Sequence, residues 1–444
     1  MNPASNAPKP RVMICSDSLG ASAGHIQASS RLARALADRG CEVLLVSGDE
    51  AFAAMKGFDY SGIKCVPRPS LKPAAQPDGT IAKMTPNGKR YEDDVAFQKQ
   101  RLEKLRTIYD QFAPNTFISE FWPVGKMYLN AEMVPFLQHV HAHNKNQPDK
   151  ATKTIAYVRD LVVKFGNSKN PGYNAANEQA KVASTLDQYF DAAIVRGDER
   201  FTPYEISLGN ALAPIKHKLH YAGYPFDANA IEPYKGTPEV VVSVGGSYHG
   251  DAKAMIDAAI ESRRHAQGDL KYAPWHFYLS PACPVADREA FASHAKEVCA
   301  AIHAENPAIP VPDFSFEENG PSFAAHLKTC KAAILRAGLS SAEAAMMGRP
   351  SVVVPYVSPA DTKEESEQYC RAKAIANKLP FVRLFDAEQL GEAKTLANAL
   401  NETYAQRHVA NHESILGNGH NHAAEAVLSI EQGKQPERLT GRQP

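Results

Sequence analysis

The sequence predicts an α/β protein of two domains, each built around a doubly wound parallel sheet. Three observations support this prediction. The chain has 444 residues, which is too long for one ordinary hydrophobic core. Short apolar runs alternate with helical patterns along almost the whole chain, as expected for parallel strands covered by helices on both faces. A strand that ends in a glycine-marked turn occurs near residue 15 and again near residue 244, so the pattern starts twice.

The first half begins with a strand–helix–strand unit. RVMIC (11–15) predicts a strand, ASSRLARALADRG (28–40) an amphipathic helix, and CEVLLVSG (41–48) the next strand. Gly40 lies just past the helix, where glycine favours the left-handed conformation that closes a helix. Further strands are expected in this half at IKCVPRP, TFISEF, KTIAYVRD and DAAIVRG.

The second half repeats the alternation. Strands are expected at EVVVSVGGS, WHFYLSP, IPVPDF, KAAILRAG and PSVVVPY. Pro, Gly and Asn are frequent in 221–239, which is typical of a linker. The expected organisation is an N-terminal domain over 8–225, a C-terminal domain over 236–432 and a disordered tail over 433–444. The polar, turn-rich segment 68–94 indicates a long insertion in the first domain.

Composition excludes several classes of protein. Lys and Arg together number 49, as do Asp and Glu. This balance argues against general nucleic-acid binding and against strong attraction to anionic membranes. We find no run of 18 apolar residues that predicts a membrane span, and no apolar signal segment at the N-terminus. The seven cysteines lack CxxC spacing, which favours reduced thiols in the cytoplasm over a disulfide framework or a zinc site.

The turn SDSLGASAGH (16–25) follows the first strand. Gly20 and Gly24 let the backbone approach a ligand, and the helix start that follows attracts negative charge. The spacing is not GxGxxG and Asp49 matches a ribose-binding carboxylate only weakly, so a nicotinamide-dependent dehydrogenase has little support. His25 can act as a general base for a substrate hydroxyl. It can equally cap or pack the helix, and the residues alone leave both interpretations open.

A second glycine turn, SVGGSYHG (243–250), follows a strand of the second half. Gly245 and Gly246 free the backbone, so that Ser247 and the exposed amides can hold a diphosphate at the start of the next helix. A tight turn that needs glycine for its conformation explains the same residues equally well.

The most specific stretch is ILRAGLSSAEAAMMGRPSVVVPY (334–356). A strand ends at Arg336, and AGLSS enters a helix that Ser340 or Ser341 can cap. Glu343 lies in the first turn of this helix. There it can accept two hydroxyls of a ribose, or it can complete a capping box with Ser340.

Further along, SEQYCRAKA (366–374) predicts another helix. Glu367 and Gln368 stand at its start, where both can bind sugar hydroxyls. An ordinary solvated helix face accounts for the same two residues.

The pattern RAGxSSxEAxxxGxPxVxVPY…EQ…RA resembles the donor half of GT-B glycosyltransferases. It is most similar to the group around the bacterial N-acetylglucosaminyltransferase that completes lipid II. The GGS turn and the N-terminal GH turn occur in that group in the same order, and other stretches resemble an uncharacterised bacterial branch of predicted GT-B transferases. The resemblance implies two Rossmann-like domains that face each other across a cleft, the first for the acceptor and the second for the nucleotide-sugar donor.

The resemblance also implies residue roles. His25, preceded by Gly24 and the turn containing Gly20, matches the histidine beside the acceptor hydroxyl and the transferred sugar. The turn GASAGH is longer than the family's usual GxGGH, as is the loop before EQ. The residues that match the donor site are Gly245, Gly246 and Ser247 at the diphosphate, Arg336, Gly338 and Ser341 in the turn beside the nucleotide, Glu343 at the ribose, and Glu367 and Gln368 at the donor sugar.

The implied reaction is a metal-independent, inverting transfer of a hexose or N-acetylhexosamine from a nucleotide diphosphate, expected to be UDP, to an unknown acceptor hydroxyl. Backbone amides would stabilise the leaving diphosphate, and His25 would deprotonate the acceptor. Glu120, at the end of ISEF, is a second base candidate. We expect no cofactor beyond the nucleotide sugar as co-substrate.

Two alternatives remain open. A UDP-sugar hydrolase or a non-hydrolysing UDP-N-acetylglucosamine 2-epimerase would share the fold, although an epimerase needs a cluster of carboxylates that the sequence does not assemble. A non-catalytic nucleotide-sugar-binding protein is the second alternative. The sequence names neither the acceptor nor the oligomeric state.

Overall fold

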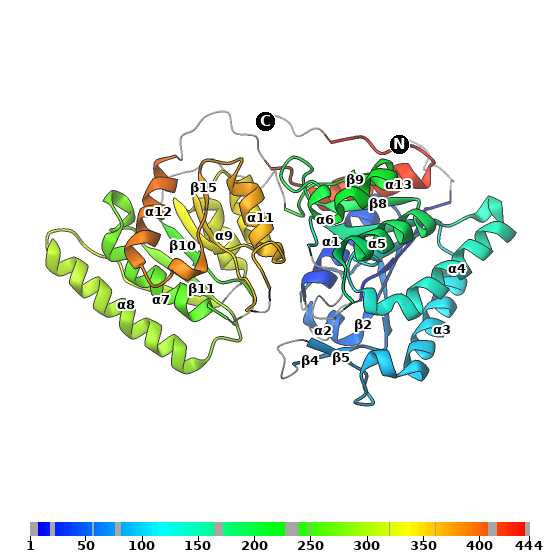
Figure 1. Ribbon diagram of the computed structural model, residues 1–444, viewed down its shortest axis with the longest axis horizontal. Coiled ribbons are helices and arrows are strands. Elements are labelled where there is room, and N and C mark those ends of the chain that lie inside the picture. The colour runs from blue at the N-terminus through cyan, green and yellow to red at the C-terminus, as the bar shows by residue number, and fades with distance from the viewer. Residues whose placement is uncertain are drawn as a thin grey trace. The chain divides into compact units, whose positions relative to one another are not determined.

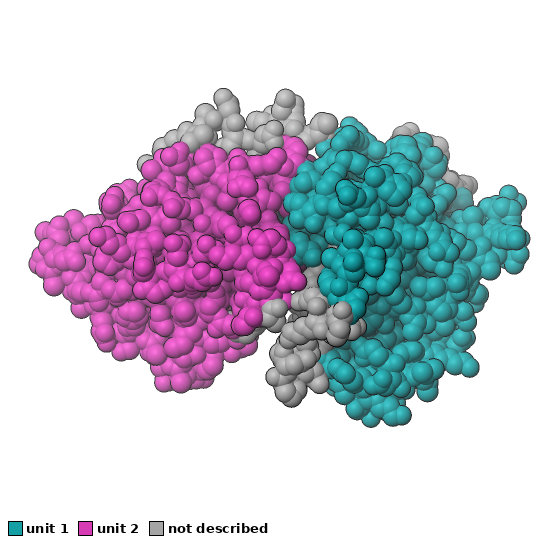
Figure 2. Space-filling view, viewed as in Figure 1, with its two compact units in different colours: residues 1–199, 203–225, 418–440 teal, residues 200–202, 226–417, 441–444 magenta. Residues whose placement is uncertain are grey.

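The chain forms two compact units, described here from a computed structural model (Figure 2). Unit 1 takes its residues from 1–199, 203–225 and 418–440, and unit 2 takes its residues from 200–202 and 226–417. The residues that the structure describes are 8–17, 23–55, 57–75, 81–163, 172–226, 239–246, 248, 250–318, 320–359, 361–406 and 415–439.

Unit 1 contains a seven-stranded sheet in the order β3-β2-β1-β6-β7-β8-β9, in which every pairing is parallel. The order reverses between β1 and β6, so the crevice where doubly wound folds bind ligands lies beyond the carboxyl ends of these two strands. The predicted strands of this half are confirmed. The strands are β1 (Arg11–Cys15), β2 (Glu42–Gly48), β3 (Ile63–Arg68), β6 (Thr116–Glu120), β7 (Lys153–Arg159), β8 (Ala192–Arg196) and β9 (Leu219–Tyr221).

Helices cover both faces of this sheet (Figure 1). In β1 the side chains alternate. Val12 and Ile14 pack in the core under α1 (Ala23–Asp38) and α13 (Gly419–Glu431), whereas Met13 and Cys15 pack in the core under α3 (Val95–Phe112) and α4 (Asn130–Asn146). The helix α1 ends before Gly40, whose φ of 87° confirms the predicted left-handed closure. The helices are α1 (Ala23–Asp38), α2 (Asp49–Ala54), α3 (Val95–Phe112), α4 (Asn130–Asn146), α5 (Ala175–Tyr189), α6 (Glu205–Leu208) and α13 (Gly419–Glu431).

The predicted insertion at 68–94 contains secondary structure of its own. The strands β4 (Lys72–Ala75) and β5 (Ile81–Met84) pair antiparallel as a separate small sheet. A short 3-10 turn (Tyr91–Asp93) then leads to Asp94, whose side chain accepts a hydrogen bond from the Phe97 amide and so caps α3.

Unit 2 contains a six-stranded parallel sheet in the order β12-β11-β10-β13-β14-β15. Its strands are β10 (Val240–Ser243), β11 (Trp275–Leu279), β12 (Phe314–Glu318), β13 (Ala332–Arg336), β14 (Ser351–Val354) and β15 (Val382–Leu384). The strand predicted at IPVPDF is displaced: β12 begins only at Phe314, because the two prolines before it cannot donate to a ladder.

The helices of unit 2 include α7 (Ala252–Ser262), α8 (Val285–Glu305), α9 (Pro321–Thr329), α10 (Leu339–Met346), α11 (Glu367–Ala376) and α12 (Ala393–Ala405). The strands and helices enclose one apolar core, with Trp275, Phe277 and Phe291 among its largest side chains. Among the described residues of both units, no helix is both long enough and apolar enough to cross a bilayer.

The C-terminal end of the chain departs from the predicted domain limits. Residues 418–432, expected in the second domain, belong to unit 1, where the Gly419 amide donates to Tyr224 O at 2.8 Å and Arg39 pairs with Glu425 at 2.7 Å. Residues 433–439, expected to form a disordered tail, also belong to unit 1, and Arg438 pairs there with Glu199 at 2.7 Å. An amphipathic helix shows in sequence that it must cover an apolar face, but not which of two sheets supplies it.

Replacing Gly419 by alanine should destabilise unit 1. A Cβ at this position would collide with the backbone carbonyl of Gly223, which cannot move aside as a side chain can. We expect a loss of about 1–3 kcal/mol, the usual cost of overpacking, measured by denaturant unfolding. Gly172→Ala is the matched control, because no atom of the described residues lies within 4 Å of a Cβ built there. Equal stability of the two variants would show that α13 does not depend on this close approach.

Candidate functional site

Two predicted residues of unit 1 meet directly. His25, in the first turn of α1, places Nδ1 2.7 Å from Oε1 of Glu120, the last residue of β6. The Glu120 side chain is fully buried, whereas 24% of the His25 side chain is exposed. A histidine of which one ring nitrogen faces a buried carboxylate presents its other nitrogen outward, the arrangement of an oriented general base.

Two cations complete the surroundings of Glu120. Arg196, the last residue of β8, donates from Nη2 to Oε1 at 2.9 Å, and Lys126 Nζ lies 2.6 Å from Oε2. The chain after β6 turns sharply to bring Lys126 back, with left-handed φ values of 70° at Phe121 and 57° at Lys126. Both carboxylate oxygens are therefore occupied, which makes Glu120 the partner of His25 rather than an independent base.

This environment sets the protonation of the pair. Burial lowers the pKa of His25 to about 4, and the negative charge of Glu120 offsets only part of that effect. Burial by itself would raise the pKa of Glu120, but His25, Lys126 and Arg196 together hold it well below its ordinary value. At neutral pH the imidazole is neutral and the carboxylate ionised, so Nδ1–H donates to Glu120 and Nε2 carries the lone pair.

Aromatic and cationic groups flank the histidine. Its ring stacks on Phe121 with centroids 5.3 Å apart and an interplanar angle of 29°. The guanidinium of Arg159, the last residue of β7, lies 5.5 Å from the Phe121 ring on which it packs. The stacking restricts rotation of the imidazole, which the hydrogen bond to Glu120 alone would allow.

A second buried ion network surrounds Asp17, two residues after the end of β1. Arg101 of α3 donates to Asp17 at 2.7 Å and to both oxygens of Glu132 at 3.0 Å, and Arg68 lies 3.2 Å from Asp17. Burial opposes ionisation of Asp17, but Arg101 and then Arg68 lower its pKa to about 2. The network thus fixes the position of Asp17 near the carboxyl end of β1.

In unit 2 the predicted donor residues Gly245, Gly246, Arg336 and Gly338 end or follow two neighbouring strands of the sheet. The strands β10, β13 and β14 are neighbours, so their carboxyl ends lie together. Gly245 adopts a φ of 80°, which confirms the need for glycine in the turn after β10. The Gly246 carbonyl accepts from Ser280 Oγ at 3.0 Å, which ties this turn to the loop after β11.

Arg336 connects the end of β13 to the start of α7. It is buried at the end of β13, and its Nη2 lies 2.7 Å from Asp251, the residue before α7. The guanidinium also lies 5.9 Å from the ring of Tyr356. These contacts give Arg336 the role of positioning the start of α7 after the glycine turn; its predicted contact with the nucleotide stays a prediction.

The helix α10 begins without the predicted side-chain cap. Gly338 occupies the capping position, and no side chain accepts a hydrogen bond there. Ser341 instead donates from Oγ to Gly338 O at 2.7 Å, because the helix starts at Leu339 and places Ser341 too far inside to cap. Glu343 stands half-buried in the second turn. The capping-box interpretation of Ser340 and Glu343 is therefore wrong.

The start of α11 lies beside the end of β14. Gln368 accepts a hydrogen bond from the Tyr356 amide at 3.0 Å, and Ser366 caps the helix by accepting from the Tyr369 amide. Glu367 is half-buried in the first turn. A pocket next to this helix start is lined by residues that include Pro355, Ser358, Lys363, Tyr369 and Asp386.

Some predicted residues are not covered by these observations. Gly20 and Ser247 lie outside the described residues, and Gly24 is described only as part of α1. Sequence reasoning missed Lys126, Arg196 and the network of Asp17. Arg196 and Asp17 each stand where a predicted strand ends, which is a signal that could have marked them; nothing in the sequence marked Lys126.

Comparison with known proteins shows the fold. No protein-family model matches the chain, and no curated protein matches it. Among solved structures, MurG from Acinetobacter baumannii matches with a TM-score of 0.55 and 14% identity, covering 95% of this chain and 100% of that one. A putative UDP-N-acetylglucosamine 2-epimerase from Listeria monocytogenes matches with a TM-score of 0.53 and 13% identity, over 98% and 100% of the two chains.

The glycotransferase of kitacinnamycin matches with a TM-score of 0.52 and 15% identity, covering 96% of this chain and 100% of that one. These identities are low, so the matches carry the fold alone. They confirm the predicted GT-B class, and MurG belongs to the group that the sequence motifs resemble.

Removing the buried carboxylate should destabilise unit 1. Glu120→Ala leaves Lys126 and Arg196 buried without their counter-charge, and we expect a loss of about 3–5 kcal/mol in denaturant unfolding. Glu42→Ala is the control: it removes a carboxylate that pairs with Arg11 at 3.0 Å but is 51% exposed, and it should cost less than about 1 kcal/mol. A loss for Glu120→Ala no larger than that of the control would contradict the buried cluster.

The lowered pKa of His25 should appear in the pH dependence of stability. Its ordinary pKa of about 6.5 applies to the unfolded chain, so unfolding takes up a proton between that pH and about 4. The contribution of His25 to the free energy of unfolding should therefore be fully present above pH 6.5. It should decline by at most about 3 kcal/mol as the pH falls toward 4. His25→Gln should lack this part of the decline. Parallel stability curves for the two proteins would rule the shift out.

Proposed function

We propose that this protein is an inverting glycosyltransferase that moves a hexose or N-acetylhexosamine from a nucleotide diphosphate sugar, with UDP as nucleotide, to an acceptor hydroxyl. The observation that carries the proposal is the pair formed by His25 and Glu120, with Nδ1 and Oε1 2.7 Å apart. A neutral histidine held by a buried, ionised carboxylate is suited to remove the proton of a hydroxyl nucleophile.

In the proposed reaction Nε2 of His25 takes the acceptor's hydroxyl proton. The acceptor oxygen attacks the anomeric carbon, and the bond from this carbon to the diphosphate oxygen breaks on the opposite side. Glu120 stabilises the imidazolium that forms, because it accepts from Nδ1 throughout. Lys126 and Arg196 keep Glu120 ionised, so the proton stays on the histidine until it returns to solvent.

Unit 2 is the proposed donor side. The turn with Gly245 and Gly246 precedes α7, and Gly338 precedes α10. Helix starts present unpaired amides to an anion, which suits the charge that develops on a leaving diphosphate without requiring a metal ion. We assign Glu343 to the ribose hydroxyls and Glu367 with Gln368 to the donor sugar, as the resemblance implies.

A second candidate is a UDP-sugar epimerase or hydrolase. The structure brings together the carboxylates that the sequence did not assemble: Asp17 and Glu132 share Arg101 in unit 1. The solved structures of the same fold include the Listeria protein described as a putative 2-epimerase. Against this candidate, Asp17 and Glu132 are buried and engaged by arginines, whereas His25 keeps an exposed side.

The nucleotide should be identified by thermal shift. A panel of UDP, dTDP, GDP, ADP, CMP and NAD should show that one nucleoside diphosphate raises the melting temperature. In Glu343→Ala the concentration of this nucleotide that gives the same rise should be at least tenfold higher. Glu289→Ala, an exposed carboxylate on α8 of the same unit, is the control and should respond as the wild type does. Stabilisation by NAD alone, or by no nucleotide, would contradict the proposal.

His25 should be required for turnover. Donor consumption with a panel of hydroxyl acceptors should fall by about 10²–10⁴ in His25→Ala, the usual value of a general base. His139→Ala is the matched control, because His139 also pairs with a carboxylate, Asp110, at 2.8 Å but on the surface. UDP release without acceptor would indicate a hydrolase, and isomerisation of the sugar an epimerase. Binding without turnover would indicate the non-catalytic alternative.

A further inference from the structure

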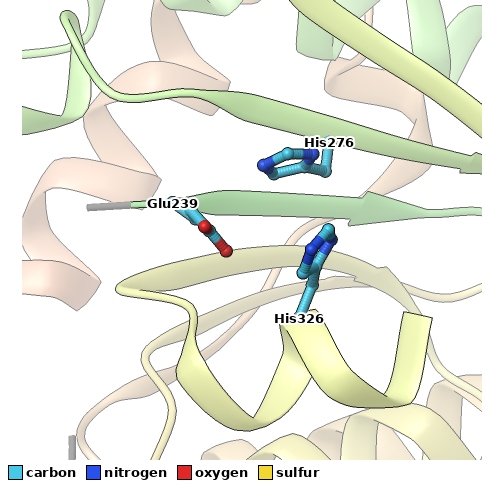
Figure 3. A group of neighbouring side chains, drawn as sticks. All are labelled: Glu239, His276 and His326. Carbon is cyan, nitrogen blue, oxygen red and sulfur yellow. The ribbon is translucent and has the colours of Figure 1, made fainter. Parts of the chain in front are cut away.

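Three side chains of unit 2 gather at a place that the proposed reaction does not use. Glu239, immediately before β10, His276 on β11 and His326 on α9 each offer a ligand atom, and these atoms lie within 4.8 Å of one another. Figure 3 shows the three side chains entering one space from these separate elements. No other group of this kind occurs among the described residues.

Two polar atoms of this group lack the hydrogen-bond partners that buried polar atoms normally have. Oε2 of Glu239 and Nε2 of His276 are both buried, and neither has a hydrogen-bond partner among the residues that the structure describes. A buried polar atom without a partner costs about 1–3 kcal/mol. The cluster contains two such atoms, an anionic oxygen and an imidazole nitrogen. A bound cation would give both atoms a partner.

The other ring nitrogens are already engaged, which orients both imidazoles. Nδ1 of His276 lies 2.6 Å from Ser315 Oγ on β12, and Nδ1 of His326 is hydrogen-bonded to Tyr278 Oη. When each Nδ1 carries the hydrogen, each Nε2 presents a lone pair. Metal-binding histidines almost always have a second hydrogen bond of this kind, which fixes tautomer and ring direction.

We propose that Glu239, His276 and His326 form a binding site for a divalent transition-metal ion of the zinc type. Two imidazole nitrogens and one carboxylate oxygen are a ligand set that zinc takes in proteins, whereas calcium and magnesium prefer oxygen alone. Tetrahedral zinc with bonds of about 2.0–2.2 Å places its ligand atoms about 3.3–3.6 Å apart. A small rotation of the side chains closes the present spacing, and water completes the coordination.

The site is structural. Glu239 lies at the amino end of β10, and the glycine turn that we assign to the donor lies at its carboxyl end. The rise of the strand separates Glu239 from this turn by roughly 15–20 Å. The helix α9 is the element that gains most. Among its described side chains only Leu327 is buried, and a metal bound by His326 would link it to β10 and β11. This proposal is independent of the proposed function.

The test uses the full chain freed of metal by a chelator and kept reduced. Zinc titration should show one equivalent bound and a rise in melting temperature, and cobalt should give the intense visible absorption of a tetrahedral site. His326→Ala and Glu239→Gln should each weaken zinc binding at least tenfold. Ser315→Ala, which removes only the hydrogen bond to His276, should weaken it about tenfold and leaves all three ligands in place if a ligand variant fails to fold.

His294→Ala is the matched control. His294 also lies in unit 2 between two carboxylates, 3.1 Å from Glu261 and 3.6 Å from Asp257, but these are already its ion-pair partners. This variant should bind zinc as the wild type does. The proposal is overturned if wild type binds no stoichiometric zinc, or if the ligand variants bind zinc as tightly as wild type, which would place the ion at the cysteines or on the surface.

Discussion

The organisation of unit 1 depends on one buried carboxylate. The Glu120 side chain has no exposed surface, and its oxygens hold His25, Lys126 and Arg196 within 2.6–2.9 Å. These partners come from α1, from the turn after β6 and from the end of β8, so a single negative charge fixes three separate segments. An ionised group at such depth is stable only with several partners. The same requirement that stabilises the carboxylate therefore orients the histidine that faces outward.

Both units place their distinctive residues where parallel strands end. In unit 1 Asp17, Glu120 and Arg196 follow or end β1, β6 and β8, and in unit 2 Gly245 and Arg336 follow or end β10 and β13. The amino-terminal edge of the unit 2 sheet carries the cluster of Glu239 and the two histidines instead. The length of the strands thus separates the proposed donor site from the proposed metal site.

Two polar side chains of unit 2 show how far a local pattern predicts the partner of a residue. Ser340 and Glu343 have the spacing of a capping box, which would make Ser340 the capping residue. In the structure α10 begins at Leu339, so Gly338 occupies the capping position and Ser340 lies inside the helix. Arg336, whose contact with a nucleotide stays a prediction, pairs with Asp251, a partner that the sequence did not indicate. Local patterns indicate what a side chain can do, but the partner that it finds depends on residues distant in sequence.

The sequence by itself determined the fold class, most strands, the closure of α1 at Gly40, and the candidacy of His25 and Glu120, because apolar periodicity and glycine positions are local signals. Only the tertiary structure decided that His25 and Glu120 form one pair, that Lys126 and Arg196 complete it, that α13 covers unit 1, and that His276 and His326 meet Glu239. Apart from the contact of Lys126 with Glu120, 6 positions away, these contacts join residues distant in the sequence, up to the 386 positions between Arg39 and Glu425. Only the packing of helices on a sheet brings such distant residues together.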